Sequence, residues 1–126
     1  MECKILPIIN SYWVIPGRFR AGEHPAIGSV DGTRLKICWL SAQGINFILD
    51  LTESGEADVN YPTYINDVSS ALNKSIIYKR FPIQDWSTPP HEEMVKILDL
   101  VEEELSEGKN IYIHCYGGLG RTGLIV

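Results

Sequence analysis

The feature that most constrains the fold is an apolar run followed by closely spaced glycines near the end of this chain of 126 residues. Residues 111–113 are apolar and rich in strand-forming types, and the run ends at His114-Cys115. Gly117, Gly118 and Gly120 follow, and a second apolar run begins a few residues later. This order predicts a strand, a tightly turned loop and the first turn of a helix.

Strands and helices alternate along the rest of the chain, which predicts an α/β fold with one domain over residues 1–126. A hairpin is expected around the turn pair Pro16-Gly17. The expected strands cover residues 12–15, 19–21, 47–49, 76–81 and 111–113; the expected helices cover residues 33–42, 64–73 and 88–105, and residues 53–62 are expected to form a loop. We therefore predict a central, mostly parallel sheet with helices on both faces.

Apolar residues at helical spacing predict which helix faces are buried. In the first helix these residues are Leu35, Cys38, Trp39 and Ala42. In the third helix, which Gly108 ends, they are Met94, Ile97, Leu98, Val101 and Leu105. Each set predicts an amphipathic helix that packs on the sheet.

Charge and cysteine content exclude several classes of protein. With 11 basic and 16 acidic residues the net charge is −5, which argues against sequence-independent binding to nucleic acid or to an anionic membrane. No apolar run approaches the roughly 18 to 20 residues that a transmembrane helix needs. Three cysteines, Cys3, Cys38 and Cys115, cannot all pair within one chain, and the N-terminus lacks the pattern of an export signal. We expect a soluble, cytoplasmic protein.

The loop between Cys115 and Thr122 has the composition of an anion site. Its glycines let the backbone curl so that successive N–H groups point into one concavity at the start of a helix. Arg121 adds a planar guanidinium that can bind two phosphate oxygens at once. We expect the substrate phosphate to be bound by Tyr116, Gly117, Gly118, Leu119, Gly120 and Arg121.

Cys115 is the candidate nucleophile because it begins this loop. The surrounding N–H donors and the helix dipole should lower the pKa of its thiol, and a thiolate facing a bound phosphate can attack phosphorus. Thr122 is expected to stabilise the sulfur and to assist its departure in a second step. His114 is expected to organise the loop through hydrogen bonds.

Asp85 is the candidate proton donor. It lies in a loop between a predicted strand and a predicted helix, 30 positions before Cys115. Displacing an alcohol or phenol from phosphorus requires an acid, and the same carboxylate could then activate the hydrolytic water.

The segment 114–123 resembles the signature loop of the cysteine-dependent protein tyrosine phosphatases, and most of all their dual-specificity branch. His114, Cys115, Gly118, Arg121 and Thr122 all match the family pattern. The segment looks most like the cyclin-dependent-kinase-associated phosphatase group, and residues 48–53 and 81–89 also resemble parts of that group.

This resemblance implies a hydrolase of phosphoproteins with a phosphocysteine intermediate on Cys115, Asp85 as general acid and Arg121 as phosphate ligand. It implies no metal and no cofactor. Leu119 stands where phosphoinositide-directed members often carry lysine, which favours phosphoprotein substrates. A phosphoinositide or another small phosphate ester is the alternative substrate.

In the family, a full helix and further helices follow the loop, whereas this sequence ends at Val126. We therefore expect a truncated phosphatase domain that another chain could complete. An inactive phosphate-binding module is the second hypothesis, and a rhodanese-like sulfur transferase is a weaker third.

For the other polar residues we expect mainly structural roles or positions at the surface. Asp50 and the nearby carboxylates are expected to be structural or solvated, and His24 and His91 to lie at the surface rather than to bind a metal. The basic residues Arg18, Arg20, Lys79 and Arg80 could form a rim that attracts phosphorylated partners or could simply be exposed strand positions.

Overall fold

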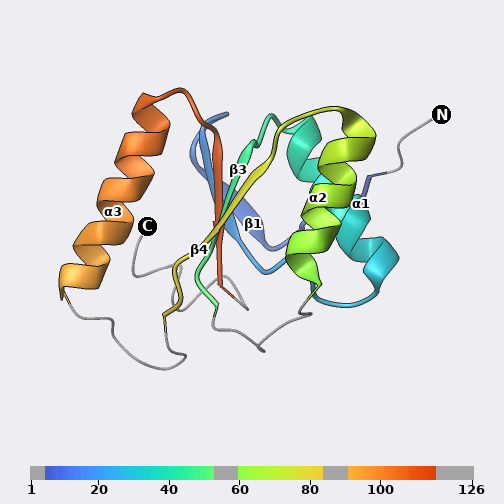
Figure 1. The fold of residues 1–126 in the computed structure, drawn as a ribbon, viewed down its shortest axis with the longest axis horizontal. Coiled ribbons are helices and arrows are strands. Elements are labelled where there is room, and N and C mark those ends of the chain that lie inside the picture. The colour runs from blue at the N-terminus through green and yellow to red at the C-terminus, as the bar shows by residue number, and fades with distance from the viewer. Residues whose placement is uncertain (1–4, 53–59, 84–90, 116–126) are drawn as a thin grey trace.

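The described residues form a five-stranded sheet between two helical layers (Figure 1). The computed structural model describes residues 5–52, 60–83 and 91–115. The strands are β1 (Ser11–Ile15), β2 (Phe19–Gly22), β3 (Phe47–Asp50), β4 (Ile77–Arg80) and β5 (Ile111–His114). Their order in the sheet is β1-β2-β5-β3-β4.

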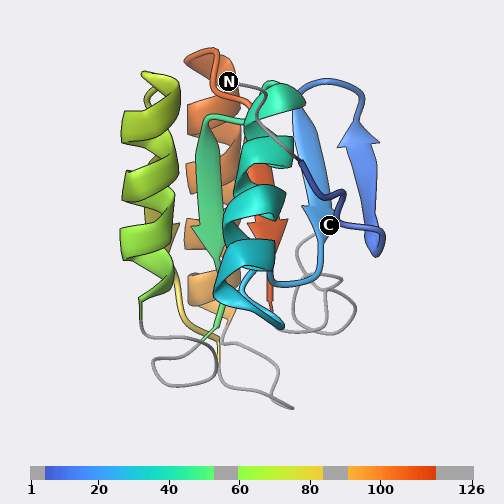
Figure 2. The ribbon, with the colours of Figure 1, turned by 90° about the vertical axis from the view of Figure 1, so that its right-hand side faces the viewer.

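The sheet is parallel except at one edge. Strand β1 pairs antiparallel with β2, whereas the pairs β2–β5, β5–β3 and β3–β4 are parallel. Figure 2 shows β1 at the edge of the sheet, running opposite to its neighbour. Gly17, at a φ of +75°, makes the turn between β1 and β2. The predicted hairpin and the mostly parallel sheet are both confirmed.

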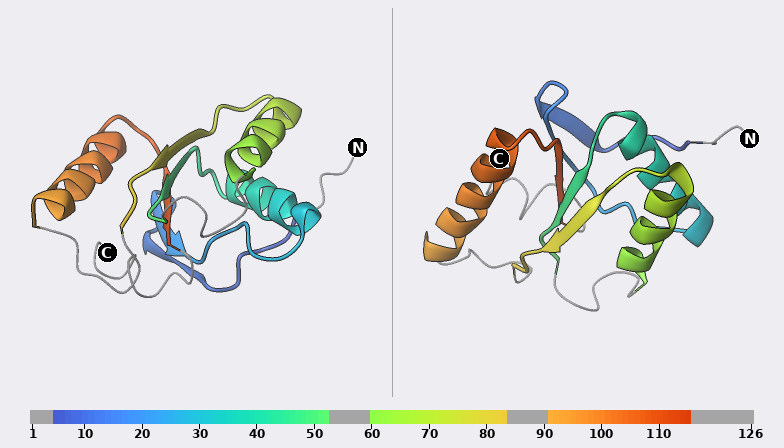
Figure 3. Two further views of the ribbon diagram at one scale, coloured as in Figure 1. Left: turned by 60° about the horizontal axis from the view of Figure 1, so that its bottom comes forward. Right: turned by 45° about the horizontal axis from the view of Figure 1, so that its top comes forward.

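In the part of the chain that the structure describes, three helices cover the two faces of the sheet. Helices α1 (Val30–Ala42) and α2 (Tyr61–Leu72) lie on one face, and α3 (His91–Ser106) lies on the other (Figures 1 and 3). Ser29 caps α1, because its hydroxyl accepts a hydrogen bond from the backbone N–H of Gly32 at 2.9 Å. Among the described residues, no helix combines the length and the apolar character that crossing a bilayer requires.

Each face of the sheet has its own hydrophobic cluster, because buried parallel strands present apolar side chains to both sides. Ile48 and Tyr112 point toward α1 and α2, where they join Ile37, Leu40 and Ile65. On the face toward α3 the cluster contains Phe47, Leu49, Ile97, Val101, Ile111 and Ile113. The α/β architecture with helices on both faces is therefore confirmed.

Sequence-based predictions for all three described helices need correction. Helix α1 begins three residues earlier than expected, and its buried side is Thr33, Ile37, Trp39, Leu40 and Ser41. Ala42 is exposed, and Leu35 and Cys38 are only half-buried. Helix α2 begins at Tyr61, so that the end of the expected loop is helical. In α3, Ile97 and Val101 are buried as expected, but Leu98 is 43% exposed.

Candidate active site

The carboxyl ends of three parallel strands bring the polar residues of the site together. In the sheet register, Asp50 on β3 lies opposite Arg80 on β4 and opposite His114 on β5. Gly22 at the end of β2 lies on the other side of His114. Ligands of parallel sheets bind at this edge. Because strand length and register set these neighbours, the sheet itself positions the site.

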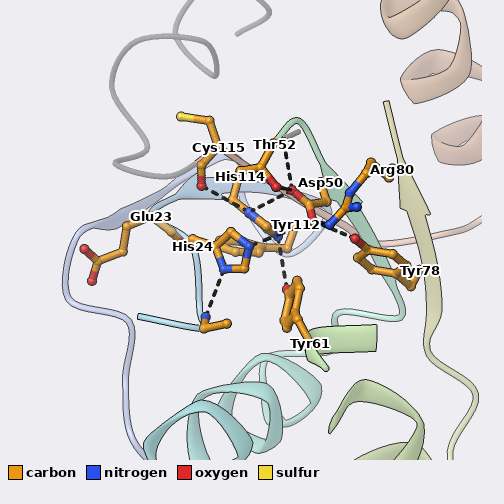
Figure 4. A network of polar contacts seen from close by, with 11 residues as sticks. Glu23, His24, Asp50, Thr52, Tyr61, Tyr78, Arg80, Tyr112, His114 and Cys115 are labelled. Atoms are coloured by element: carbon orange, nitrogen blue, oxygen red, sulfur yellow. Dashed lines mark hydrogen bonds and ion pairs between the residues drawn. The ribbon is translucent and has the colours of Figure 1, made fainter. Parts of the chain in front are cut away.

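Asp50 is the centre of the polar network (Figure 4). Its side chain is fully buried. One carboxylate oxygen, Oδ1, accepts hydrogen bonds from the backbone N–H of Thr52 at 2.9 Å and from its hydroxyl at 2.6 Å. The other oxygen, Oδ2, accepts one from the Tyr78 hydroxyl at 2.6 Å and lies 3.5 Å from Nη2 of Arg80. A buried carboxylate is stable only with such partners.

His114 joins this network to the candidate nucleophile. Its side chain is fully buried, with Nδ1 at 3.2 Å from the backbone oxygen of Cys115 and at 3.8 Å from Oδ1 of Asp50. The Tyr61 hydroxyl, from the first turn of α2, lies 3.0 Å from Nε2 of His114. These contacts connect His114 to the backbone of Cys115, to β3 and to α2.

His24 lies in the same cluster, which corrects the prediction that it is a surface residue. Its side chain is fully buried between the rings of Tyr61 and His114, with centroid distances of 4.5 Å and 4.4 Å. Its Nε2 is 3.9 Å from Oδ2 of Asp50. The loop from β2 to α1 turns the side chain inward, and no spacing pattern in the sequence indicates this.

Cys115 follows directly after β5 and is buried, with 2% of its surface exposed. In Figure 4 its sulfur points away from the two histidines. The backbone N–H of Leu51 donates to the backbone oxygen of His114 at 2.9 Å, which fixes the end of β5 against the end of β3. Cys115 therefore stands at the carboxyl end of a central parallel strand, and its role as nucleophile stays a prediction.

Burial and hydrogen bonding set the charge states in the cluster. Burial lowers the pKa of His114 below its ordinary value of 6.5, although Asp50 partly offsets this, so that the imidazole is neutral near pH 7. For Asp50, burial raises the pKa, but the charge that His114 carries once it is protonated in acid and the hydrogen bonds from Thr52 and Tyr78 outweigh burial and lower it. The site therefore contains a buried carboxylate beside a neutral imidazole.

The same residues offer a possible set of metal ligands. One ligand atom from each of His24, Asp50 and His114 lies within 4.8 Å of the others. Both oxygens of Asp50 already accept hydrogen bonds, and the Arg80 guanidinium stands beside one of them. Both ring nitrogens of His114 also have partners. These contacts favour a hydrogen-bonded network over a metal centre, because a cation would have to displace them.

Several predicted site residues lie outside the described part of the chain. These are Asp85, Tyr116, Gly117, Gly118, Leu119, Gly120, Arg121 and Thr122. The structure therefore describes the base of the candidate site and leaves the roles of these residues as predictions. Residue 83 ends one described segment and Cys115 ends another.

Most of the network has no signature in the sequence. The local pattern places Tyr61 in a loop, identifies Tyr78 only as a strand residue, and interprets Arg80 as part of a basic rim or as an exposed strand position. Arg80 instead pairs with Asp50, while Arg18 donates from Nε to Oδ1 of Asn110 at 2.9 Å. The one signal in the sequence is that Asp50 and His114 each stand at the carboxyl end of a predicted strand.

Comparison with known proteins places the chain and its fold among phosphatases. A family model described as "Polymorphic toxin system, DSP-PTPase phosphatase" (Tc-R-P) matches residues 27–126. A protein of Invertebrate iridescent virus 3 named "Putative tyrosine phosphatase 067L" is 32% identical over 91 residues, which cover 69% of this chain and 34% of the viral protein.

Solved phosphatase structures share the fold. Kinase associated phosphatase (KAP), in a variant whose catalytic-site cysteine is replaced by serine, gives a TM-score of 0.71 at 24% identity, covering 85% of this chain and 61% of that one. Tk-PTP in its active form gives a TM-score of 0.69 at 26% identity, covering 93% of this chain and 69% of that one.

The matched segments span about a third of the length of the curated relatives. The family model, by contrast, matches more than three quarters of this chain. Together with the viral relative and the KAP-like fold, this confirms the resemblance that the sequence indicated. The chain therefore belongs to the Tc-R-P family of DSP-PTPase phosphatases, within the dual-specificity branch of the cysteine-dependent phosphatases.

Proposed function

We propose that this chain hydrolyses phosphate monoesters through a covalent phosphocysteine on Cys115. The observation that carries the proposal is the position of Cys115, which directly follows a central parallel strand and whose backbone oxygen lies 3.2 Å from Nδ1 of His114. The glycine-rich sequence that begins there, with Arg121 six residues later, supplies the expected anion site.

The reaction consists of two displacements at phosphorus. In the first, the Cys115 thiolate attacks phosphorus and the bond to the leaving oxygen breaks, while Asp85 donates a proton to that oxygen. In the second, the Asp85 carboxylate takes a proton from water, the water oxygen attacks phosphorus, and the thiolate leaves with assistance from the Thr122 hydroxyl. Arg121 binds two phosphate oxygens throughout, and inorganic phosphate is released.

We further propose that the substrates are phosphorylated proteins. Leu119 supplies no positive charge to the loop, which favours a phosphorylated side chain over a polyanionic inositol headgroup. A nucleophilic thiolate must also stay reduced, so we place the reaction in the cytoplasm. A phosphoinositide is the alternative substrate.

The test is hydrolysis of p-nitrophenyl phosphate in the presence of EDTA. We expect turnover in the parent chain, loss of all measurable turnover in Cys115→Ala, and no change in Cys38→Ala, the matched control at the other described cysteine. Phosphate or vanadate binding without turnover in the parent would instead support a binding module. Turnover that survives Cys115→Ala would contradict the phosphocysteine mechanism.

A further inference from the structure

The hydrogen bonds of His114 show which ring nitrogen carries its proton. Nδ1 lies 3.2 Å from the backbone oxygen of Cys115, and a carbonyl oxygen can only accept. In the neutral ring Nδ1 therefore carries the proton, and Nε2 accepts from the Tyr61 hydroxyl at 3.0 Å. His114 thus donates to the backbone of the residue that carries the nucleophile.

His24 carries its proton on the opposite ring nitrogen. The backbone N–H of Ala26 donates to Nδ1 of His24 at 3.0 Å, so that Nδ1 is the acceptor. The proton of the neutral ring is then on Nε2, which lies 3.9 Å from Oδ2 of Asp50. Two buried histidines with different tautomers therefore each place their proton-bearing nitrogen near one carboxylate, at 3.8 Å for His114 and 3.9 Å for His24.

We propose that Asp50 is a positioning residue that selects the tautomer of His114 and thereby holds the Cys115 backbone in place. The proton-bearing Nδ1 of His114 lies 3.8 Å from Oδ1 of Asp50. With the proton on Nε2, the Nδ1 lone pair would face both this carboxylate and the Cys115 carbonyl, and the ring would repel both. The buried charge of Asp50 makes that alternative costly because the surroundings have a low dielectric constant.

The groups around Asp50 keep its charge and its orientation fixed. Tyr78 and Arg80 face it from β4, Thr52 from the residues after β3, His24 from the loop after β2, and His114 from β5. Because these contacts join the ends of β3, β4 and β5, Asp50 connects His114-Cys115 to the strand that precedes Asp85 in the sequence. The catalytic consequence of this proposal rests on the proposed function, whereas the tautomer does not.

The test determines, by ¹⁵N-correlated NMR at pH 7, which ring nitrogen carries the proton in each of the chain's three histidines. His91→Gln assists the assignment. We expect a proton on Nδ1 of His114 and on Nε2 of His24 in the parent. In Asp50→Asn we expect His114 to become a mixture of tautomers, and kcat for p-nitrophenyl phosphate to fall at least tenfold with less than threefold change in KM.

Asp67→Asn is the matched control, because Asp67 is half-exposed and pairs with Arg34 on the outside of the molecule. It should change neither the tautomers nor kcat. A parent spectrum with the proton on Nε2 of His114 would overturn the proposal, as would an Asp50→Asn variant that keeps both the parent tautomer and the parent kcat. If the parent tautomers are as expected but no turnover occurs, the proposed function fails while the positioning of His114 stands.

A milder variant covers the case in which Asp50→Asn does not fold. Tyr78→Phe removes one hydrogen-bond donor from Oδ2 of Asp50 and leaves the packing of the ring in place. We then expect the resonances of Nδ1 in His114 and Nε2 in His24 to shift, while those of His91 stay unchanged. If neither histidine responds, the carboxylate does not govern the tautomers and the proposal is wrong.

Discussion

The Tyr61 hydroxyl lies 3.0 Å from Nε2 of His114, so that the first turn of α2 contacts the last residue of β5. Both side chains are fully buried. A helix on one face of the sheet thereby supports the residue next to the candidate nucleophile. The candidate site thus depends on the packing of α2 as well as on the loop that carries Cys115.

Replacing Tyr61 with phenylalanine should destabilise the fold. The change leaves Nε2 of His114 as a buried acceptor that has lost its donor, which costs about 1–3 kcal/mol. Urea denaturation followed by circular dichroism measures this as a lower free energy of unfolding. Tyr12→Phe is the control, because Tyr12 is 45% exposed and should tolerate the change within about 0.5 kcal/mol. Equal stabilities of the two variants would contradict the role given to the hydrogen bond.

Stability should fall as the solution is acidified below about pH 6.5. Because burial lowers the pKa of His114 from its ordinary value of 6.5, the unfolded chain binds this proton at a higher pH than the folded chain does. The free energy of unfolding then decreases by up to about 1.4 kcal/mol per pH unit for one proton.

The measurement is a series of urea denaturation curves between pH 7.5 and about pH 5. His114→Gln should lose this part of the pH dependence. Asp50 acts in a different window, because its lowered pKa stabilises the fold above its ordinary value of 3.8 and this contribution disappears in stronger acid. A parent whose stability does not change between pH 7 and pH 5 would disprove the assignment to His114.

Gly22→Ala should destabilise the sheet by crowding. A Cβ atom at this position would lie 2.5 Å from Cβ of Ser11 and 2.6 Å from the Tyr112 hydroxyl oxygen, closer than real contacts allow. Overpacking of this kind costs about 1–3 kcal/mol. Thermal denaturation should show a lower Tm than in Gly28→Ala, where the added Cβ meets open space and only the positive φ is unfavourable. A Tm for Gly22→Ala at or above that of Gly28→Ala would contradict this account.

Asp85→Asn should lower the turnover of esters with poor leaving groups most strongly. An amide cannot protonate the departing oxygen, so we expect a loss of roughly 10²–10⁴-fold with phenyl phosphate and a smaller loss with p-nitrophenyl phosphate, whose leaving group needs less assistance. Steady-state kinetics with both esters measures the difference. Asp99→Asn, a change on α3, is the control. Equal losses for the two esters would show that another residue is the acid.

The sequence predicted the architecture because its strongest signals are local. The apolar runs of β3 and β5 are typical of strands buried on both faces, and their alternation with helices predicts a parallel sheet. The spacing of His114, Cys115 and Arg121 indicated the chemistry and the family without any tertiary information. These patterns can be read from the sequence because hydrogen bonding and apolar burial along one segment determine them.

Only the tertiary structure brought His24, Asp50, Tyr61 and Tyr78 together at His114. These residues come from four separate segments, and each alone resembles an ordinary loop, helix or strand residue. Their proximity depends on the sheet register that places Asp50 opposite both Arg80 and His114, and on the packing of α2 against that sheet. Register and packing are long-range properties, so no local pattern encodes the partners that a buried carboxylate must find.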